Sequence, residues 1–144
     1  MLTVHLSGGE EMLKKATLAG KSINTKVIGV SILTSLEDSD TLALFGNHLD
    51  DQIEKLFKVA AKVNLDGIVC SPHELEMSKT ILRSHTIKIT PGIRDIKVED
   101  DQARTMSAKA AVEQGATFLV IGRPITQAAD ISTALKIFSD SIEK

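Results

Sequence analysis

The chain has 144 residues, of which 42% are hydrophobic, and this is enough for one domain with a single buried core. Its 17 basic and 19 acidic residues give a net charge of -2 and form no basic block, which argues against nucleic acid and anionic membranes as partners. A single cysteine excludes an internal disulfide, and no apolar run is long enough to span a bilayer. We therefore expect one domain over residues 1–144, located in the reducing cytoplasm.

Five short apolar runs rich in β-branched residues predict β-strands. In chain order they cover residues 2–6, 26–33, 67–71, 87–90 and 118–122. Most of these runs are almost continuously apolar, which is typical of parallel strands that are covered on both faces. Helical segments separate them, so the predicted class is α/β, with a parallel sheet and right-handed crossovers.

Amphipathic spacing predicts the helices. The clearest helix has one apolar face, made of Ile53, Leu56, Phe57, Ala60 and Ala61. Ser107 is placed to cap a second helix, which Gly115 then ends, and Asp130 is placed to cap the last one. That last helix also has an apolar face, which we expect to pack on the core and which consists of Ile131, Ala134, Leu135, Phe138 and Ile142.

Polar residues follow three of the predicted strands, where parallel α/β folds bind their ligands. Thr34 and its neighbouring serine follow the second strand, Arg94 follows a Pro-Gly turn after the fourth, and Gly122 with Arg123 follows the fifth. A glycine leaves its backbone N–H open to an oxyanion, and guanidinium groups are forked donors that suit phosphate. The pattern predicts a phosphorylated ligand. The alternative is that both arginines are ordinary surface residues.

Five segments resemble, in order, the carboxyl-terminal part of bacterial orotidine 5'-phosphate decarboxylase. They read "VHLSGG", "VSILTS", "LDGIVCS", "TPGIRDIKVEDDQARTMSAKAA" and "FLVIGRPITQAAD". The resemblance implies a partial (β/α)8 TIM barrel with about five parallel strands and flanking helices, strands four to eight of the whole barrel. It also implies a homodimer without metal or organic cofactor that converts orotidine monophosphate to uridine monophosphate and CO2 in pyrimidine biosynthesis. The runner-up class is another phosphate-binding barrel, such as an isomerase or an aldolase.

The same resemblance implies roles for particular residues. Thr34 should lie near the pyrimidine and ribose, and the residues that bind phosphate should be Arg94, Gln102, Gly122 and Arg123. The family's catalytic lysine belongs to a D-x-K-x-x-D motif at the end of strand three, and the resemblance begins after that point. We therefore assign no catalytic residue and expect the chain, a lyase by family, to be inactive on its own.

One stretch of the sequence has the same spacing as the family's catalytic D-x-K-x-x-D motif. Asp95, Lys97 and Asp100 have the D-x-K-x-x-D spacing, but they follow a Pro-Gly turn in a loop rather than an apolar strand. A lysine in a loop is poorly preorganised as a catalytic acid, so we interpret this stretch as a solvated loop. We also expect Cys70 to be a buried, inert thiol and Lys88, the single charge of its strand, to cap an edge or extend to solvent. The histidines lack the spacing of metal ligands.

Five strands of eight cannot close a barrel, so two unpaired strand edges should favour association. Either copies pair edge to edge, or the strands flatten into an open sheet with helices on both sides; we expect a homo-oligomer. Three functional hypotheses remain open. The chain is a decarboxylase fragment that needs a missing segment in trans, a non-catalytic module that binds uridine or other nucleotide phosphates, or a decayed remnant that self-associates without a ligand.

Overall fold

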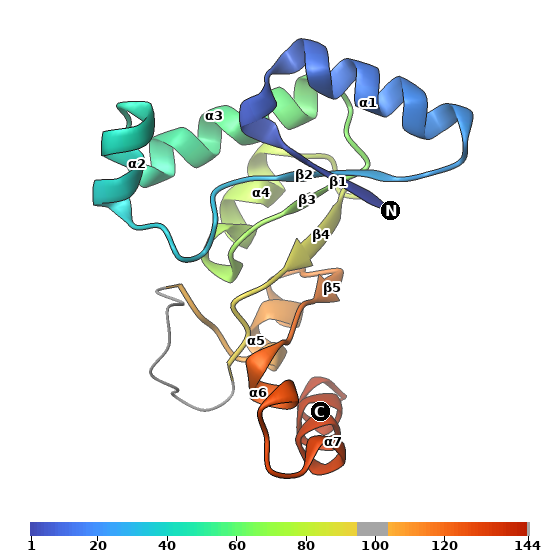
Figure 1. The fold of residues 1–144 in the computed structure, drawn as a ribbon, viewed down its shortest axis with the longest axis vertical. Helices are drawn as coiled ribbons and strands as arrows, with labels where there is room; N and C mark the ends of the chain where they lie inside the picture. Colours follow the sequence, from blue (N-terminus) through green and yellow to red (C-terminus); the bar gives the residue numbers. More distant parts are fainter. Residues whose placement is uncertain (95–103, 144) are drawn as a thin grey trace.

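Five parallel strands form a single sheet in the order β1-β2-β3-β4-β5 in the computed structural model, which describes residues 1–94 and 104–143 (Figure 1). The strands are β1 (Leu2–His5), β2 (Val27–Val30), β3 (Gly67–Val69), β4 (Ile87–Thr90) and β5 (Phe118–Leu119). The α-helices are α1 (Glu10–Ser22), α2 (Asp38–Phe45), α3 (Leu49–Lys62), α4 (Leu75–Ile81), α5 (Ala108–Glu113), α6 (Arg123–Thr126) and α7 (Ile131–Ile142). Two 3-10 turns, η1 (Leu6–Gly8) and η2 (Pro72–Glu74), follow β1 and β3. The predicted α/β class with a parallel sheet is confirmed.

Four strands are shorter than the apolar runs that predicted them, and the difference is largest for β2 and β5. The run 26–33 continues past Val30, the end of β2, into a turn in which the Leu36 N–H donates to the Leu33 carbonyl at 3.0 Å. The run 118–122 ends as a strand at Leu119, because Gly122 already precedes α6. In both places apolar residues continue into the loop at the carboxyl end of the strand, so hydropathy alone overestimates the strand.

Helix α3 covers the sheet with the face that its sequence predicts. Ile53, Leu56, Phe57 and Ala60 are buried, and Phe57 is completely inaccessible to solvent. They join one apolar cluster whose other members include Leu6, Leu13, Ile68, Cys70 and Leu75. The core of the molecule therefore lies between the sheet and the helices α1, α3 and α4.

Two predicted caps and one predicted helix end are confirmed. The Ser107 hydroxyl accepts the Ala110 N–H at 3.3 Å, and Gly115 adopts a φ of 94° just after α5. The Asp130 carboxylate accepts the N–H groups of Ser132 and Thr133 at 2.9 and 3.2 Å at the start of α7. Each cap satisfies backbone donors that the first turn of a helix leaves open.

The expected packing of the last helix on the core is confirmed for one side chain, Phe138, and is wrong for most of the predicted face. Only Phe138 of the predicted apolar face of α7 is buried, whereas Ile131 and Leu135 are 54% and 56% exposed and Ile142 is 39% exposed. Helix α7 packs against α5 and α6, which are too short to cover it. The amphipathic pattern correctly predicts a helix here, but this chain supplies only part of the surface that the pattern calls for.

The two faces of the sheet differ in burial at the carboxyl ends of the strands. Partners in parallel register share a face, and one such row across the sheet consists of His5, Val30, Val69, Ile89 and Phe118. All five are half-buried or exposed. One residue earlier, the row on the opposite face contains Gly29, Ile68 and Lys88, which are buried. The strand ends on this face are thus less well covered than the continuous apolar runs predict.

Lys88 also departs from its expected position. Its side chain is buried at 6% exposure, with Nζ donating to the Thr86 carbonyl at 3.4 Å, and β4 is an interior strand of the sheet. It neither caps an edge nor reaches solvent. Cys70 agrees with its prediction, because it is buried and desolvation, the main cause, raises the pKa of its thiol well above the usual range.

Asp66 fixes the amino-terminal edge of the sheet. Its carboxylate accepts the Val27 N–H at 2.9 Å and the Lys26 ammonium at 3.2 Å, and so joins the residue before β3 to the start of β2. Partial burial opposes ionisation of this group. The hydrogen bonds from Val27 and Lys26 outweigh it, and the pKa of Asp66 is lowered.

Candidate functional site

The polar residues of interest lie at the carboxyl edge of the sheet. Because all five strands are parallel, the segments that follow them leave from the same edge. Strands β4 and β5 are direct neighbours, with Thr90 in register with Leu119, so the segments carrying Arg94 and Gly122 begin next to each other. The sequence prediction that these positions share one edge is confirmed by the topology.

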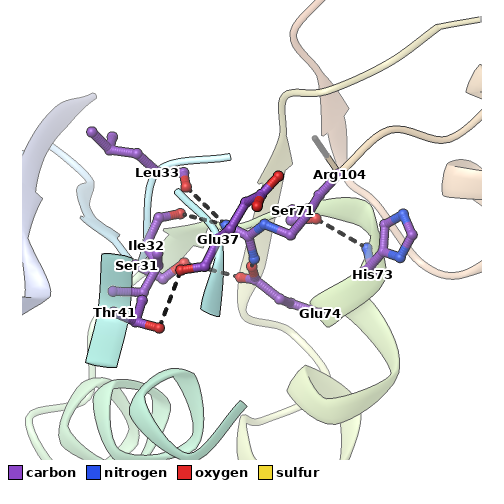
Figure 2. A network of polar contacts seen from close by, with 9 residues as sticks. All are labelled: Ser31, Ile32, Leu33, Glu37, Thr41, Ser71, His73, Glu74 and Arg104. Carbon is purple, nitrogen blue, oxygen red and sulfur yellow. Dashed lines mark hydrogen bonds and ion pairs between the residues drawn. The ribbon is translucent and has the colours of Figure 1, made fainter. Parts of the chain in front are cut away.

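Thr34 lies in the turn after β2 and is buried. The turn is tied to the rest of the edge through the carbonyls of Ile32 and Leu33, which both accept from the Arg104 guanidinium, at 3.4 and 2.9 Å (Figure 2). The position of Thr34 is therefore set by a contact with a residue far along the chain.

Arg94 follows β4 on a short extended stretch that pairs with a later segment. Its N–H donates to the Met106 carbonyl at 2.9 Å, and the Met106 N–H donates to the Gly92 carbonyl at 3.1 Å. Gly92 has a φ of 77°, and a Cβ at this position would lie 2.7 Å from the Arg104 carbonyl oxygen, so only glycine fits. The half-buried Arg94 guanidinium donates to the Ile93 carbonyl at 2.7 Å.

Gly122 and Arg123 form the start of α6. Gly122 is exposed, and a Cβ built on it would meet none of the described atoms within 4 Å, so space is open beside its backbone. Arg123 is half-buried and is followed by Pro124 in the first turn of the helix. Both residues thus follow the carboxyl end of β5, the strand next to β4.

Gln102 was also predicted to bind phosphate, and it lies outside the described residues. The same holds for Asp95, Lys97 and Asp100, whose D-x-K-x-x-D spacing we interpreted as a solvated loop. That interpretation stays a prediction.

A buried ion pair lies at the same edge and was missed by the sequence analysis. The Arg104 guanidinium donates to one oxygen of Glu74, and the Ser31 hydroxyl donates to the other at 3.0 Å (Figure 2). Only 12% of the Arg104 side chain and 4% of the Glu74 side chain are exposed. Arg104 Nε is buried without a hydrogen-bond partner among residues 1–94 and 104–143. We refer to Ser31, Glu74 and Arg104 as the buried triad.

Burial is the main influence on Glu74 and raises the pKa of its carboxyl, which the neighbouring Arg104 charge and the Ser31 hydroxyl oppose without cancelling. The sequence holds a weak signal for this residue, since Glu74 follows a predicted strand end. However, nothing local separates it from Glu76, which is 74% exposed and pairs with Lys79 on the surface of α4. The tertiary contacts with Arg104 and Ser31 distinguish Glu74 from Glu76.

Two of the four histidines make ordinary contacts. His48 lies 2.8 Å from an Asp38 oxygen, which raises the pKa of the imidazole, and His73 Nε2 lies 3.0 Å from the Thr105 carbonyl. In the part of the chain that the structure describes, no three His, Cys, Asp or Glu side chains come together as a metal site. No described helix is long and apolar enough to cross a membrane.

Comparison with known proteins identifies the family. Residues 1–138 match the family model described as "Orotidine 5'-phosphate decarboxylase / HUMPS family". The chain belongs to this family. Curated orotidine 5'-phosphate decarboxylases from Wolbachia pipientis and Psychromonas ingrahamii are 38% and 40% identical over 143 and 148 residues. Each match covers 99% of this chain and 63% of the relative, so the chain spans less than two thirds of their length.

Solved structures of the orotidine 5'-phosphate decarboxylase family confirm the partial TIM barrel. The enzyme from Lactobacillus acidophilus superposes with a TM-score of 0.78 at 31% identity, covering 99% of this chain and 62% of that one. The Methanocaldococcus jannaschii enzyme, complexed with the inhibitor BMP, gives a TM-score of 0.73 over 99% of this chain and 61% of its own; at 23% identity it supports the fold alone. The incomplete cover of the strand ends on one face of the sheet is consistent with a barrel of which only five strands are present.

Proposed function

We propose that this chain is a nucleotide-phosphate-binding part of an orotidine 5'-phosphate decarboxylase that grips orotidine or uridine monophosphate but does not decarboxylate on its own. The observation that carries the proposal is the convergence of Arg94 and the Gly122–Arg123 pair at the neighbouring ends of β4 and β5. In barrel enzymes the last two strand ends form the usual phosphate site.

The chemistry of these residues suits a phosphate dianion. Two guanidinium groups supply charge and forked donors, and the open backbone at Gly122 leaves room for an oxyanion to approach. Thr34 adds a hydroxyl from the turn after β2, where the pyrimidine and ribose would lie, and Gln102 is a further proposed phosphate ligand. The proposed ligands thus come from three segments at one edge of the sheet.

The proposal assigns no catalytic residue. Decarboxylation leaves negative charge on the pyrimidine carbon, which requires a rigidly held cation. The sequence contains D-x-K-x-x-D only at Asp95, Lys97 and Asp100, directly after the Pro-Gly-Ile-Arg stretch rather than after a strand. We therefore expect binding without turnover unless another polypeptide supplies the lysine.

We further propose a cytoplasmic homo-oligomer. Strands β1 and β5 are the outer strands of the sheet, and apolar side chains near them are exposed, among them Leu2 at 52% and Phe118 at 48%. An unpaired edge beside apolar surface favours association. A mass of 15.5 kDa, that of one chain, in light scattering at micromolar concentration would contradict this part of the proposal.

Calorimetric titration with uridine monophosphate and with uridine tests the binding. The nucleotide should bind at least about tenfold more tightly than the nucleoside, because the proposed grip acts mainly on the phosphate. Arg123→Ala should abolish this preference. The matched control is Arg83→Ala, since Arg83 is exposed and precedes β4, at the opposite edge of the sheet. Equal affinity for the nucleotide and the nucleoside would contradict the proposed phosphate site.

The hypothesis of a decayed remnant without a ligand predicts a different result in the same titration. It would give no binding heat with either compound. If the chain folds and self-associates but binds neither compound, it keeps the fold of the family without its ligand.

A further inference from the structure

The segment that follows residue 103 sets the backbone position of Arg94. Ile93 and Met106 form an isolated parallel bridge, and the two hydrogen bonds between Arg94, Met106 and Gly92 flank it. The close approach of the Arg104 carbonyl to Gly92 leaves little freedom between the two segments. Wherever residues 104–106 are held, the stretch carrying Arg94 is held with them.

Residues 104–106 are in turn fixed by the buried triad. The Arg104 guanidinium binds Glu74, which follows β3, and the carbonyls of Ile32 and Leu33, which follow β2 (Figure 2). The Ser31 hydroxyl holds the second oxygen of Glu74. A planar guanidinium with several partners has one favourable orientation, unlike an ammonium at the end of a flexible chain. The ends of β2, β3 and β4 are thus locked in one arrangement.

We infer that Glu74 and Arg104 are positioning residues: they act through the backbone to set Arg94 and the Thr34 turn at the spacing that nucleotide binding requires. The inference rests on the proposed function. Arg104 contacts the carbonyl of Leu33, the residue before Thr34, and its own carbonyl lies against Gly92, two residues before Arg94. One side chain therefore connects two of the proposed ligand-binding segments.

Stability alone is a poor explanation for this pair. Burying two charges has a desolvation penalty that offsets most of their attraction, so a buried ion pair adds little net stability compared with apolar side chains of similar size. Both Glu74 oxygens are engaged by donors from different segments, which fixes geometry rather than merely neutralising charge. A pair of this kind is well suited to set the spacing of the site.

Three variants separate positioning from stability. Glu74→Gln removes one charge and leaves the Arg104 charge buried without a countercharge. The double variant Glu74→Gln, Arg104→Met removes both charges. Glu76→Gln, the same substitution two residues away on the surface of α4, is the control. Each is measured by thermal unfolding and by calorimetric titration with uridine monophosphate.

Glu74→Gln should lower both the melting temperature and the affinity. The double variant should regain most of the melting temperature yet bind uridine monophosphate at least about tenfold more weakly than the unaltered protein, since displacement of a binding group is not corrected by removing charge. Glu76→Gln should change neither. A double variant that binds as tightly as the unaltered protein would overturn the inference. If Glu74→Gln does not fold, the affinity of the double variant alone tests whether the pair positions the site.

Amide hydrogen exchange provides a readout that needs no ligand. In the double variant the Arg94 and Met106 amides should exchange faster, whereas the Ile87 amide, which donates to the Asp66 carbonyl at the other end of β4, should not change. If the unaltered protein fails to bind uridine monophosphate, the proposed function is wrong, and the exchange rates still decide the coupling. Unchanged exchange at Arg94 and Met106 would contradict it.

Discussion

The amino-terminal and carboxyl-terminal parts of this molecule have similar sequence patterns but very different burial. In residues 1–94, strands β1–β4 and helices α1, α3 and α4 enclose a core that includes Leu13, Phe57 and Ile68, all fully buried. In residues 104–143 the buried apolar side chains are Ala108, Ala111 and Phe138. Figure 1 shows α5, α6 and α7 at the end of the molecule opposite to α1 and α3.

The difference shows what an amphipathic pattern can and cannot predict. A stripe of apolar residues predicts that a helix has a covered face, but it does not say which surface covers it. Helix α3 packs its apolar face against the sheet of this chain, whereas α7 packs mainly against the short helices α5 and α6. The uncovered apolar face of α7 thus adds a second reason for the proposed association, beside the unpaired edges of β1 and β5.

The largest expected effect comes from a pair of phenylalanines, one in each part. Phe57→Ala should lower the free energy of unfolding by about 3–5 kcal/mol, because Phe57 is completely buried and leaves a cavity. Phe118→Ala should lower it by less than about 1 kcal/mol in the monomer, since 48% of that side chain is exposed. Urea denaturation at low protein concentration measures both. Similar losses at the two positions would mean that the carboxyl-terminal part has its own packed core.

Association should depend on the exposed face of α7. Leu135→Asp should weaken self-association by at least about tenfold, because a charge would have to be buried in an apolar contact. Leu44→Asp on α2, where Leu44 is 66% exposed, is the matched control and should leave association unchanged. Sedimentation velocity over a range of concentrations measures both variants. An equal effect of the two substitutions would remove α7 from the proposed contact.

A smaller effect is expected at Asp66, in the amino-terminal part. Asp66→Asn should lower the free energy of unfolding by about 1–2 kcal/mol at pH 7, because the acceptor of the hydrogen bonds from Val27 and Lys26 loses its charge. The pKa of Asp66 is lowered on folding, so ionisation stabilises the folded state above the ordinary pKa of 3.8, and this contribution disappears as the pH falls through the folded-state value. The difference from the unaltered protein should therefore shrink below about pH 3.8. Urea denaturation at several pH values measures this, and a difference that stays constant down to pH 2 would contradict the assignment.

The smallest expected effect tests the cap of α5. Ser107→Ala should lower the free energy of unfolding by about 1 kcal/mol, because the Ala110 N–H loses its acceptor. Ser84→Ala, at an exposed position between α4 and β4, is the control for the same substitution. Thermal unfolding compares the two, and equal shifts would show that the cap contributes nothing specific.

Local rules predicted much of the fold and part of the site. The five strands, the buried face of α3 and the caps at Ser107 and Asp130 follow from residue patterns within a few positions. The exposure of Leu135 and the burial of Lys88 did not, because they depend on which distant segments pack nearby. Glu74 was missed for the same reason, since its partner Arg104 is 30 residues away. Sequence position located the edge that carries Arg94 and Arg123, but not the contacts that hold it.

Calorimetric titration of the chain with orotidine monophosphate tests the central claim most directly, because binding and turnover give different heat signals. We predict saturable heats that return to the baseline after each injection, which indicates a nucleotide that is bound and not converted. Sustained heat after each injection would show turnover, and its loss in Lys97→Ala would mean that the loop lysine is catalytic after all. The absence of any binding heat would contradict the proposed phosphate grip itself.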